Sequence, residues 1–219
     1  MSLKNDDEIR INAPAKVNLY LDIVGKRDDG YHLINSVFQT VSLYDTVTIR
    51  LNSTGDITVK SNVSGIPEGR RNTAYKAAEL FLRHYGLTCG ADIFIEKRIP
   101  DKAGLGGGSS DAAAVLHGLN KLCRIESDSN ELCKIAVKIG ADVPFFIKGG
   151  TAFVGGIGEN ITSLKCAEGI NFVIAKGNNG ISTADAYGKY DNTEGIEHSY
   201  TTELLQALSC RQLQDIADN

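Results

Sequence analysis

The alternation of apolar and polar residues predicts that the chain begins with strands. Every second residue from Val17 to Ile23 is apolar, which is the two-residue period of a strand with one buried face. Short strands are also predicted at Thr46–Leu51 and Asp56–Lys60. The Asn-Ser-Thr-Gly-Asp sequence between these two predicts a hairpin-like connection.

Helical spacing appears further along the chain. Asn72 is a good N-cap for a helix that extends to Tyr85, and the alternating segment Ala91–Arg98 then predicts another strand. Two more helices are predicted, one over the alanine-rich Ala112–Leu122 and one over roughly Ser127–Ile139. Strand, glycine-rich loop and helix therefore follow one another in the middle of the chain.

The last third of the chain is predicted to contain short strands and helices. The apolar residues that follow a Gly-Ala-Asp-Val-Pro turn, within the run Val143–Ile147, are interpreted as a strand, as is Asn171–Lys176. A short helix is predicted from Ser182, and an amphipathic segment over Tyr200–Ala217. We place a domain boundary near residue 160, which divides the chain into residues 1–160 and 161–219.

Composition narrows the class of protein. The 219 residues carry a net charge of -4 without a Lys/Arg block, which argues against a protein that binds a nucleic-acid backbone. No apolar run is long enough to span a membrane, and the first ten residues show no secretory or transit signal. We therefore expect a cytoplasmic protein without nucleic-acid or membrane partners.

Cysteine and histidine give no sign of a metal site. The five cysteines form no C-x-x-C pair and the four histidines are scattered, so reduced, packed thiols are the simpler interpretation. We expect no metal held by protein nitrogen or sulfur.

The most informative segment is a loop with four glycines in five positions. Glycine can adopt positive φ and lets a ligand approach the backbone, and Gly104 and Gly106–Gly108 precede Ser109 and Ser110 at the predicted start of a helix. A helix N-terminus favours an anion, so phosphate is the expected ligand. The loop matches neither the Walker A motif nor the dinucleotide fingerprint, because serine stands where those motifs need lysine or a third glycine. A flexible linker is the alternative.

Four ordered motifs resemble the GHMP kinase superfamily, which includes galactokinase, homoserine kinase and mevalonate kinase. The loop motif consists of Pro100, Asp101, Lys102, Ala103, Gly104, Leu105, Gly106, Gly107, Gly108, Ser109, Ser110 and Asp111. The others are Ala13-Pro14-Ala15-Lys16-Val17-Asn18-Leu19, Gly25–His32 and Gly140-Ala141-Asp142-Val143-Pro144-Phe145. Together they resemble the branch that acts on 4-diphosphocytidyl-2-C-methyl-D-erythritol in the non-mevalonate route to isoprenoid precursors.

The resemblance implies the reaction and the fold. ATP would phosphorylate the 2-hydroxyl of the methylerythritol moiety. No Walker B carboxylate is evident in the sequence, so we expect Mg²⁺ to be held mainly by ATP oxygens, with a loop serine as a candidate ligand. The fold would be α+β with two domains, and the N-terminal domain would contain a left-handed βαβ crossover, contrary to the usual hand. Relatives continue into a further glycine-rich motif that does not follow Tyr187 here, so we expect an incomplete C-terminal domain.

The resemblance also assigns roles to single residues. Lys16 matches the catalytic lysine and Asp142 the catalytic aspartate, while the loop residues Pro100–Ser110 would bind ATP and Asn72 and Lys97 would border adenine. Cytidine diphosphate substrate residues would be Asn18, Tyr31, His32, Thr183 and Tyr187. Of these, His32 would meet the cytosine edge, and the two tyrosine rings would stack on the base.

Simpler interpretations stay open for these residues. A lysine on an alternating strand usually faces solvent, and an aspartate before Val-Pro often closes a turn. Two other functions also remain: a nucleotide-binding protein without turnover, and a GHMP kinase for a different small alcohol. The sequence does not indicate an oligomeric state.

Overall fold

The computed structural model describes residues 8–165, 169–177, 180 and 183–193. Two long strands, β1 (Glu8–Lys26) and β2 (His32–Asn52), pair with each other and contribute to two compact units. The first unit contains Met1–Ala15, Val41–Pro100 and Gly106–Lys148. The second contains Lys16–Thr40, Asp101–Leu105 and Gly149–Asn219.

A mixed sheet forms one layer of the first unit. Strand β4 (Gly90–Glu96) lies between β2, which is antiparallel to it, and β3 (Ile57–Ser61), which is parallel. The predicted hairpin is therefore wrong, because β4 separates the two strands that it would have joined. Residues 52–56 do form a local turn, in which Asn52 and Thr54 side chains bind nearby backbone. Turn-forming residues predict where the chain reverses, but they do not determine which strand pairs with which.

Helix α1 (Thr73–His84) connects the parallel strands β3 and β4, after a short 3₁₀ turn at Gly69–Arg71. This is the predicted βαβ unit, and the hand of its crossover stays a prediction. Asn72 caps α1 as expected, because its Oδ1 accepts from Ala74 N at 2.8 Å.

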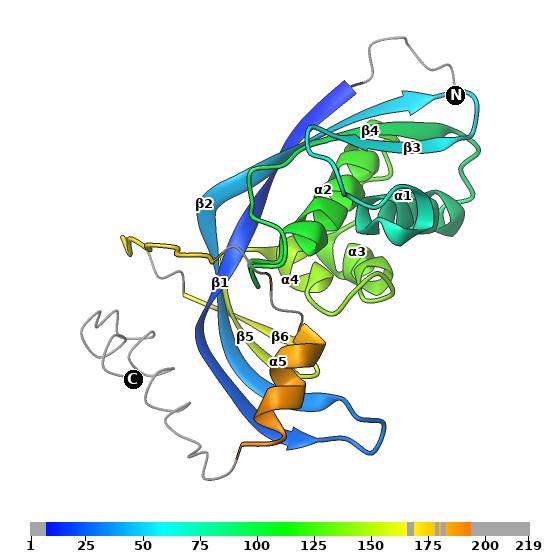
Figure 1. The fold of residues 1–219 in the computed structure, drawn as a ribbon. Helices are drawn as coiled ribbons and strands as arrows, with labels where there is room; N and C mark the ends of the chain where they lie inside the picture. Colours follow the sequence, from blue (N-terminus) through cyan, green and yellow to red (C-terminus); the bar gives the residue numbers. More distant parts are fainter. Residues whose placement is uncertain (1–7, 166–168, 178–179, 181–182, 194–219) are drawn as a thin grey trace. The chain divides into compact units, whose positions relative to one another are not determined.

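Three further helices complete the first unit. They are α2 (Gly107–Leu122), α3 (Ser129–Ala136) and α4 (Val143–Lys148). Figure 1 shows α1, α2 and α3 gathered beside β3 and β4. Helix α2 approaches the sheet closely at Gly118, where a Cβ would lie 2.3 Å from Ile49 Cδ1. Core side chains from both layers are fully buried, among them Ile49, Phe81, Ile95, Leu116 and Phe145.

The segment Val143–Ile147 is a helix and not the predicted strand. All five residues are buried, and a short apolar run that is buried on all sides has no period by which strand and helix can be distinguished. Pro144 is compatible with helix here because it lies in the first turn, where its missing N–H costs no hydrogen bond.

The second unit contains β5 (Thr151–Gly156), β6 (Asn160–Leu164) and α5 (Thr183–Tyr190). Strand β5 pairs antiparallel with the N-terminal half of β2 and with β6. Buried Val37 contacts Leu19, Tyr20, Phe153 and Leu164.

The predicted strand Asn171–Lys176 is not formed among the residues that the structure describes. Its side chains are exposed, and Val173 reaches 98%. An apolar segment becomes a strand only where a neighbouring strand shares its hydrogen bonds, and no described strand pairs with these residues. The predicted segment Tyr200–Ala217 lies outside the described residues. The architecture is α+β, as predicted, and the domain boundary near residue 160 stays a prediction. No helix within the described ranges has the length and apolar character needed to span a membrane.

Candidate active site

The glycine-rich loop connects β4 to α2 through three residues with positive φ. Gly104 and Gly106 both have φ of +71°, and Lys102 adopts +51°. Gly107 and Gly108 already belong to α2, where helix geometry requires negative φ, so among the four glycines of the loop only Gly104 and Gly106 use positive φ. Within the second unit, Leu105 is buried and its carbonyl accepts from Lys16 N at 3.0 Å.

The N-terminus of α2 has the features of an anion site. The helix begins at Gly107, two residues before the predicted serine start, and its N-cap Gly106 has no side chain. Asn72 and Asp128 cap α1 and α3 with their side chains, whereas none of the described side chains caps α2. Its first N–H groups are therefore left for a ligand or solvent, and the helix dipole favours negative charge there.

Two buried oxygens lie just inside α2 without a partner. Ser110 Oγ and Asp111 Oδ1 accept and donate no hydrogen bond among the described residues, although Ser110 is 1% and Asp111 4% exposed. Carboxylate and hydroxyl oxygens are the donor types that Mg²⁺ prefers. The described residues contain no group of three or more His, Cys, Asp or Glu that could hold a metal ion alone.

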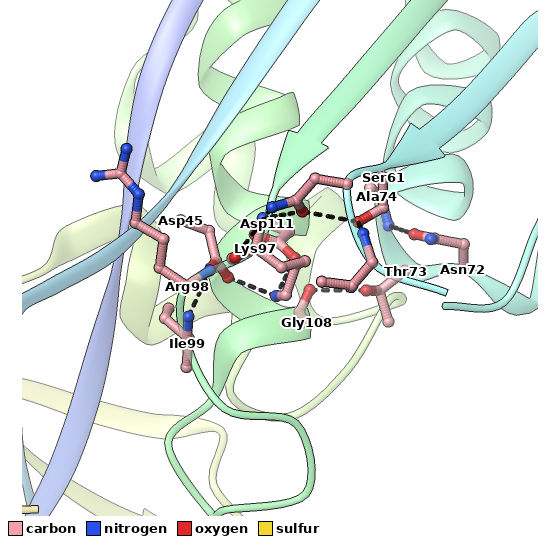
Figure 2. Close-up of polar contacts among 12 residues, drawn as sticks. Asp45, Ser61, Asn72, Thr73, Ala74, Lys97, Arg98, Ile99, Gly108 and Asp111 are labelled. Carbon is pink, nitrogen blue, oxygen red and sulfur yellow. Dashed lines mark hydrogen bonds and ion pairs between the residues drawn. The ribbon is translucent and has the colours of Figure 1, made fainter. Parts of the chain in front are cut away.

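A buried ion cluster lies beside this helix start, and we call Asp45, Lys97 and Asp111 the Lys97 cluster (Figure 2). Lys97 Nζ donates to Asp45 Oδ2 and, at 2.8 Å, to Asp111 Oδ2. The side chains of Asp45 and Asp111 are 0% and 5% exposed, and that of Lys97 is 10% exposed. The Lys97 ammonium, predicted to border adenine, is therefore occupied by two carboxylates.

Burial and charge act in opposite directions on the pKa values of this cluster. Burial raises the pKa of Asp111 from 3.8 to about 7, although the charge and hydrogen bond of Lys97 act in the opposite direction. Burial also lowers the pKa of Lys97, but Asp111 and Asp45 outweigh it, so the Lys97 pKa is raised from 10.5. One ammonium thus faces two carboxyl groups, and Asp111 is the member whose pKa is raised toward neutral pH.

Asn72 and Thr73 join α1 to this region. The Asn72 side chain caps α1 and donates to Pro67 O at 2.9 Å, while Thr73 Oγ1 donates to Gly108 O at 2.7 Å. The described contacts of Asn72 are structural, and its predicted place beside adenine stays a prediction. Thr73 is the residue of α1 that holds the first turn of α2.

Lys16 is buried, which excludes the simple interpretation of a solvent-facing lysine. It is 6% exposed, its Nζ donates to Asn18 Oδ1 at 2.5 Å, and it lies 4.2 Å from the centre of the Phe38 ring. Asn18 Nδ2 in turn donates to Ser36 Oγ at 3.0 Å. The strands β1 and β2 thus hold the predicted catalytic lysine and the predicted substrate residue Asn18 in one hydrogen-bonded chain.

Asp142 lies in the turn that precedes α4. Val143 N donates to Gly140 O at 3.2 Å to close this turn, and the Asp142 side chain is half-buried. Asp142 belongs to the first unit and Lys16 to the second. The turn is formed as the simple interpretation expects, so the catalytic role of Asp142 stays a prediction.

His32 anchors a cluster in the second unit, formed with Tyr187, Asp191 and Lys26. The His32 and Tyr187 rings stack with centroids 4.6 Å apart and planes 18° apart. His32 Nε2 lies 2.6 Å from Asp191 Oδ1, and Lys26 Nζ donates to Asp191 Oδ2 at 2.5 Å. Hydrogen bonds from His32 and then Lys26 lower the pKa of Asp191, which keeps it an acceptor.

The remaining predicted substrate residues, Tyr31, Tyr187 and Thr183, lie in three different settings. Tyr31 is 60% exposed, next to the turn at Gly30 that joins β1 to β2. Tyr187 stacks on His32, so a cytosine between Tyr31 and Tyr187 would have to use the other face of the Tyr187 ring. Thr183 is the first residue of α5, and its side chain lies outside the described parts.

The sequence interpretation missed four residues that the structure connects to this machinery. They are Ser36, Asp45, Asp111 as a partner of Lys97, and Asp191. Only Asp45 had a signal, since an aspartate at the start of an apolar strand needs a partner if it is buried. Asp191 carried none, because its partner His32 is distant in sequence.

Comparison with known proteins agrees with the motifs. Residues 72–150 match the family described as GHMP kinases N terminal domain. The 4-diphosphocytidyl-2-C-methyl-D-erythritol kinase of Clostridium tetani is 47% identical over 211 residues, which is 96% of this chain and 75% of that protein. The enzyme of the same name from Clostridium novyi is 45% identical over 207 residues, 94% of this chain and 74% of that protein. The chain belongs to the 4-diphosphocytidyl-2-C-methyl-D-erythritol kinase family.

Solved structures agree with this assignment. A crystal structure of 4-(cytidine 5'-diphospho)-2C-methyl-D-erythritol kinase is 44% identical with a TM-score of 0.61, over 71% of this chain and 55% of that one. The homoserine kinase of Cytophaga hutchinsonii shares the fold at 19% identity, with a TM-score of 0.65 over all of this chain and 72% of that one. The chain is thus a member of a family of small-molecule kinases with the GHMP kinase fold, and it spans about three quarters of the length of its curated relatives.

Proposed function

We propose that this protein transfers the γ-phosphoryl group of ATP to the 2-hydroxyl of 4-diphosphocytidyl-2-C-methyl-D-erythritol. The observation that carries the proposal is the identity of 42–47% to kinases named for this substrate, over about 95% of the chain. The residues that the resemblance assigns to catalysis and substrate binding are all present in this sequence.

In the proposed mechanism, the substrate hydroxyl oxygen forms a bond to the γ-phosphorus, and the bond from that phosphorus to the β–γ bridging oxygen breaks to release ADP. Asp142 accepts the hydroxyl proton, the task of a general base. Lys16 supplies positive charge to the transferred group, because phosphoryl transfer depends mainly on positioning and charge stabilisation.

The α2 N-terminus supports the choice of donor. Uncapped N–H groups after a left-handed Gly106 suit the phosphates of ATP. Mg²⁺, when bound to ATP, neutralises phosphate charge, and Ser110 would hold it on the protein side. The unpartnered Ser110 Oγ and Asp111 Oδ1 fit a hard cation in donor type.

The His32 cluster supports the choice of acceptor. A carboxylate only accepts hydrogen bonds, so His32 Nε2 donates to Asp191 and Nδ1 of the neutral ring remains an acceptor. Such an acceptor suits the exocyclic amine of cytosine. The face of an aromatic ring such as that of Tyr31 or Tyr187 suits the base itself.

The test is an ADP-release assay with purified chain, ATP and Mg²⁺, run in parallel with the cytidine substrate, mevalonate and homoserine. We expect turnover with the cytidine substrate alone. Release with mevalonate or homoserine but not with the cytidine substrate would contradict the proposal. Binding of ATP without release of ADP for any alcohol would indicate a nucleotide-binding protein without turnover.

A further inference from the structure

The ion pairs of the Lys97 cluster lie where the chain enters and leaves the glycine-rich loop. Strand register explains the position of Asp45: Thr46 pairs with Glu96 at the end of β4, so Asp45 continues the ladder opposite Lys97. Beyond this point the chain leaves the sheet toward Pro100 and the loop. Asp45 therefore lies on β2 beside the point where the chain leaves β4 for the loop.

One carboxylate oxygen of Asp45 holds the start of the loop. Asp45 Oδ1 accepts from Arg98 N at 2.6 Å and from Ile99 N at 2.8 Å. These two N–H groups lie beyond the end of β4 and have no strand partner in the described ladder. A charged acceptor shared by two backbone donors is stronger than neutral hydrogen bonds, so the backbone at 98–99 is fixed to β2.

The other oxygen of Asp45 connects this point to α2 through Lys97. Lys97 Nζ donates to Asp45 Oδ2 and to Asp111 Oδ2, and Asp111 lies in the second turn of α2. The ammonium also packs against the start of that helix, because a Cβ on Gly107 would lie 3.2 Å from Lys97 Nζ. Both ends of the loop are therefore held by one buried ammonium and one buried carboxylate (Figure 2).

We propose that Asp45 and Lys97 are positioning residues for nucleotide: together they fix the two ends of the glycine-rich loop so that its backbone is ordered for the phosphates of ATP. The inference rests on the proposed function for the identity of the ligand. It gives Lys97 a different task from contact with adenine. It also gives a reason for a buried ion cluster, which by itself adds little to stability.

A purely structural cluster and a positioning cluster make different predictions. If the cluster is purely structural, its disruption should lower thermal stability and weaken the binding of all ligands together. If it is a positioning cluster, its disruption should weaken the binding of ATP and leave the affinity for the cytidine substrate unchanged, because the predicted substrate residues Tyr31, His32 and Tyr187 lie in the second unit. The experiment therefore compares both ligands in the same variants.

The principal variant is Asp45→Asn, which keeps the shape of the side chain and removes its charge. The matched control is Glu96→Gln, which removes a neighbouring but exposed carboxylate paired with Arg98 at 2.7 Å. We expect Asp45→Asn to weaken ATP about 10-fold in calorimetric titration, the factor that corresponds to loss of one charged hydrogen bond. The Kd of the cytidine substrate should stay within about 2-fold, and Glu96→Gln should leave both unchanged.

Hydrogen exchange without nucleotide provides a second readout. In Asp45→Asn the amides of Arg98 and Ile99 should exchange at least about 10-fold faster than in the parent, whereas the amides in the middle of α2 should not change. This arm does not depend on the ligand. If the parent binds no ATP, the proposed function fails, while the exchange rates still decide whether Asp45 fixes the loop.

Asp111→Asn keeps the inference falsifiable if Asp45→Asn does not fold. It leaves the contacts of Asp45 with Arg98 and Ile99 and removes the charge by which Lys97 holds α2. We expect weaker ATP binding with normal exchange at 98–99. Unchanged ATP affinity in the folded variants, or equal losses for ATP and the cytidine substrate, would overturn the inference.

Discussion

His32 Nε2 lies 2.6 Å from Asp191 Oδ1, although 159 positions separate the two residues in sequence. Asp191 also accepts from Lys26, so one carboxylate joins the end of β1, the start of β2 and the residue that follows α5. The contact fixes the tautomer of His32, since the carboxylate can only accept. A residue outside the recognised motifs thus prepares the predicted cytosine contact.

Replacement of Asp191 by alanine should weaken the cytidine substrate. Without its partner the His32 ring is free to change tautomer and to rotate, and we expect the Kd to rise about 10-fold while ATP affinity stays the same. The matched control is Glu131→Ala, which removes the carboxylate of another histidine pair, that of His84 at 3.2 Å. Equal Kd values for parent and Asp191→Ala would show that Asp191 has no part in binding.

Asp142→Asn should separate binding from chemistry. The amide keeps the size of the side chain but takes up no proton, so we expect kcat to fall about 10²–10⁴-fold with nearly unchanged Kd for both substrates. Asp92→Asn, at an exposed position of β4 that accepts from Thr58, serves as the control. A variant that turned over at the parent rate would show that Asp142 is only a turn residue.

Gly107→Val should abolish ATP binding. A Cβ at this position would meet Ile99 Cγ2 and Lys97 Nζ, both at 3.2 Å, and two further methyl groups would displace the loop from the helix start. Gly177→Ala is the control, because nothing lies within 4 Å of its added Cβ. The measurement is ATP titration together with circular dichroism. Parent-like affinity with native circular dichroism would place the phosphates elsewhere.

Asp111 should make stability depend on pH. Its pKa is raised from 3.8 to about 7 in the folded state, so the folded protein keeps a proton that the unfolded chain has lost. Stability therefore falls as pH rises between these values and stays level above them. We expect the parent Tm to fall between about pH 4 and about pH 7 relative to that of Asp111→Asn, and to run parallel to it at higher pH. Parallel Tm curves for the two proteins would contradict the assignment.

Local sequence signals predicted much of the fold. The N-cap Asn72, the alternation through Ile93 and Ile95, and the glycines around α2 correctly indicated α1, β4 and the loop between β4 and α2. Two features of the fold could not be predicted: which strands pair with one another, and whether a short buried apolar run forms a helix or a strand. The partner of β3 is decided by α1 and β4, and the buried run at 143–147 has no period that distinguishes helix from strand.

The motifs located the candidate site but not the contacts that support it. Lys16, Asn18 and the glycine-rich loop follow from the resemblance, because their neighbours in sequence identify them. Asp45 and Asp191 act on residues that are distant in sequence and come close only in the folded chain. Lys97 shows the same limit. The resemblance marked it as a site residue, but its partners Asp45 and Asp111 could not be predicted.

The most direct test of the central claim is to identify the product by ³¹P NMR and mass spectrometry after incubation of the chain with ATP, Mg²⁺ and 4-diphosphocytidyl-2-C-methyl-D-erythritol. Release of ADP alone does not distinguish transfer from hydrolysis of ATP. We expect a new phosphomonoester on the 2-hydroxyl, formed in equal amount with ADP and almost absent with Asp142→Asn. Inorganic phosphate in place of that ester, or the same ester at the same rate from Asp142→Asn, would contradict it.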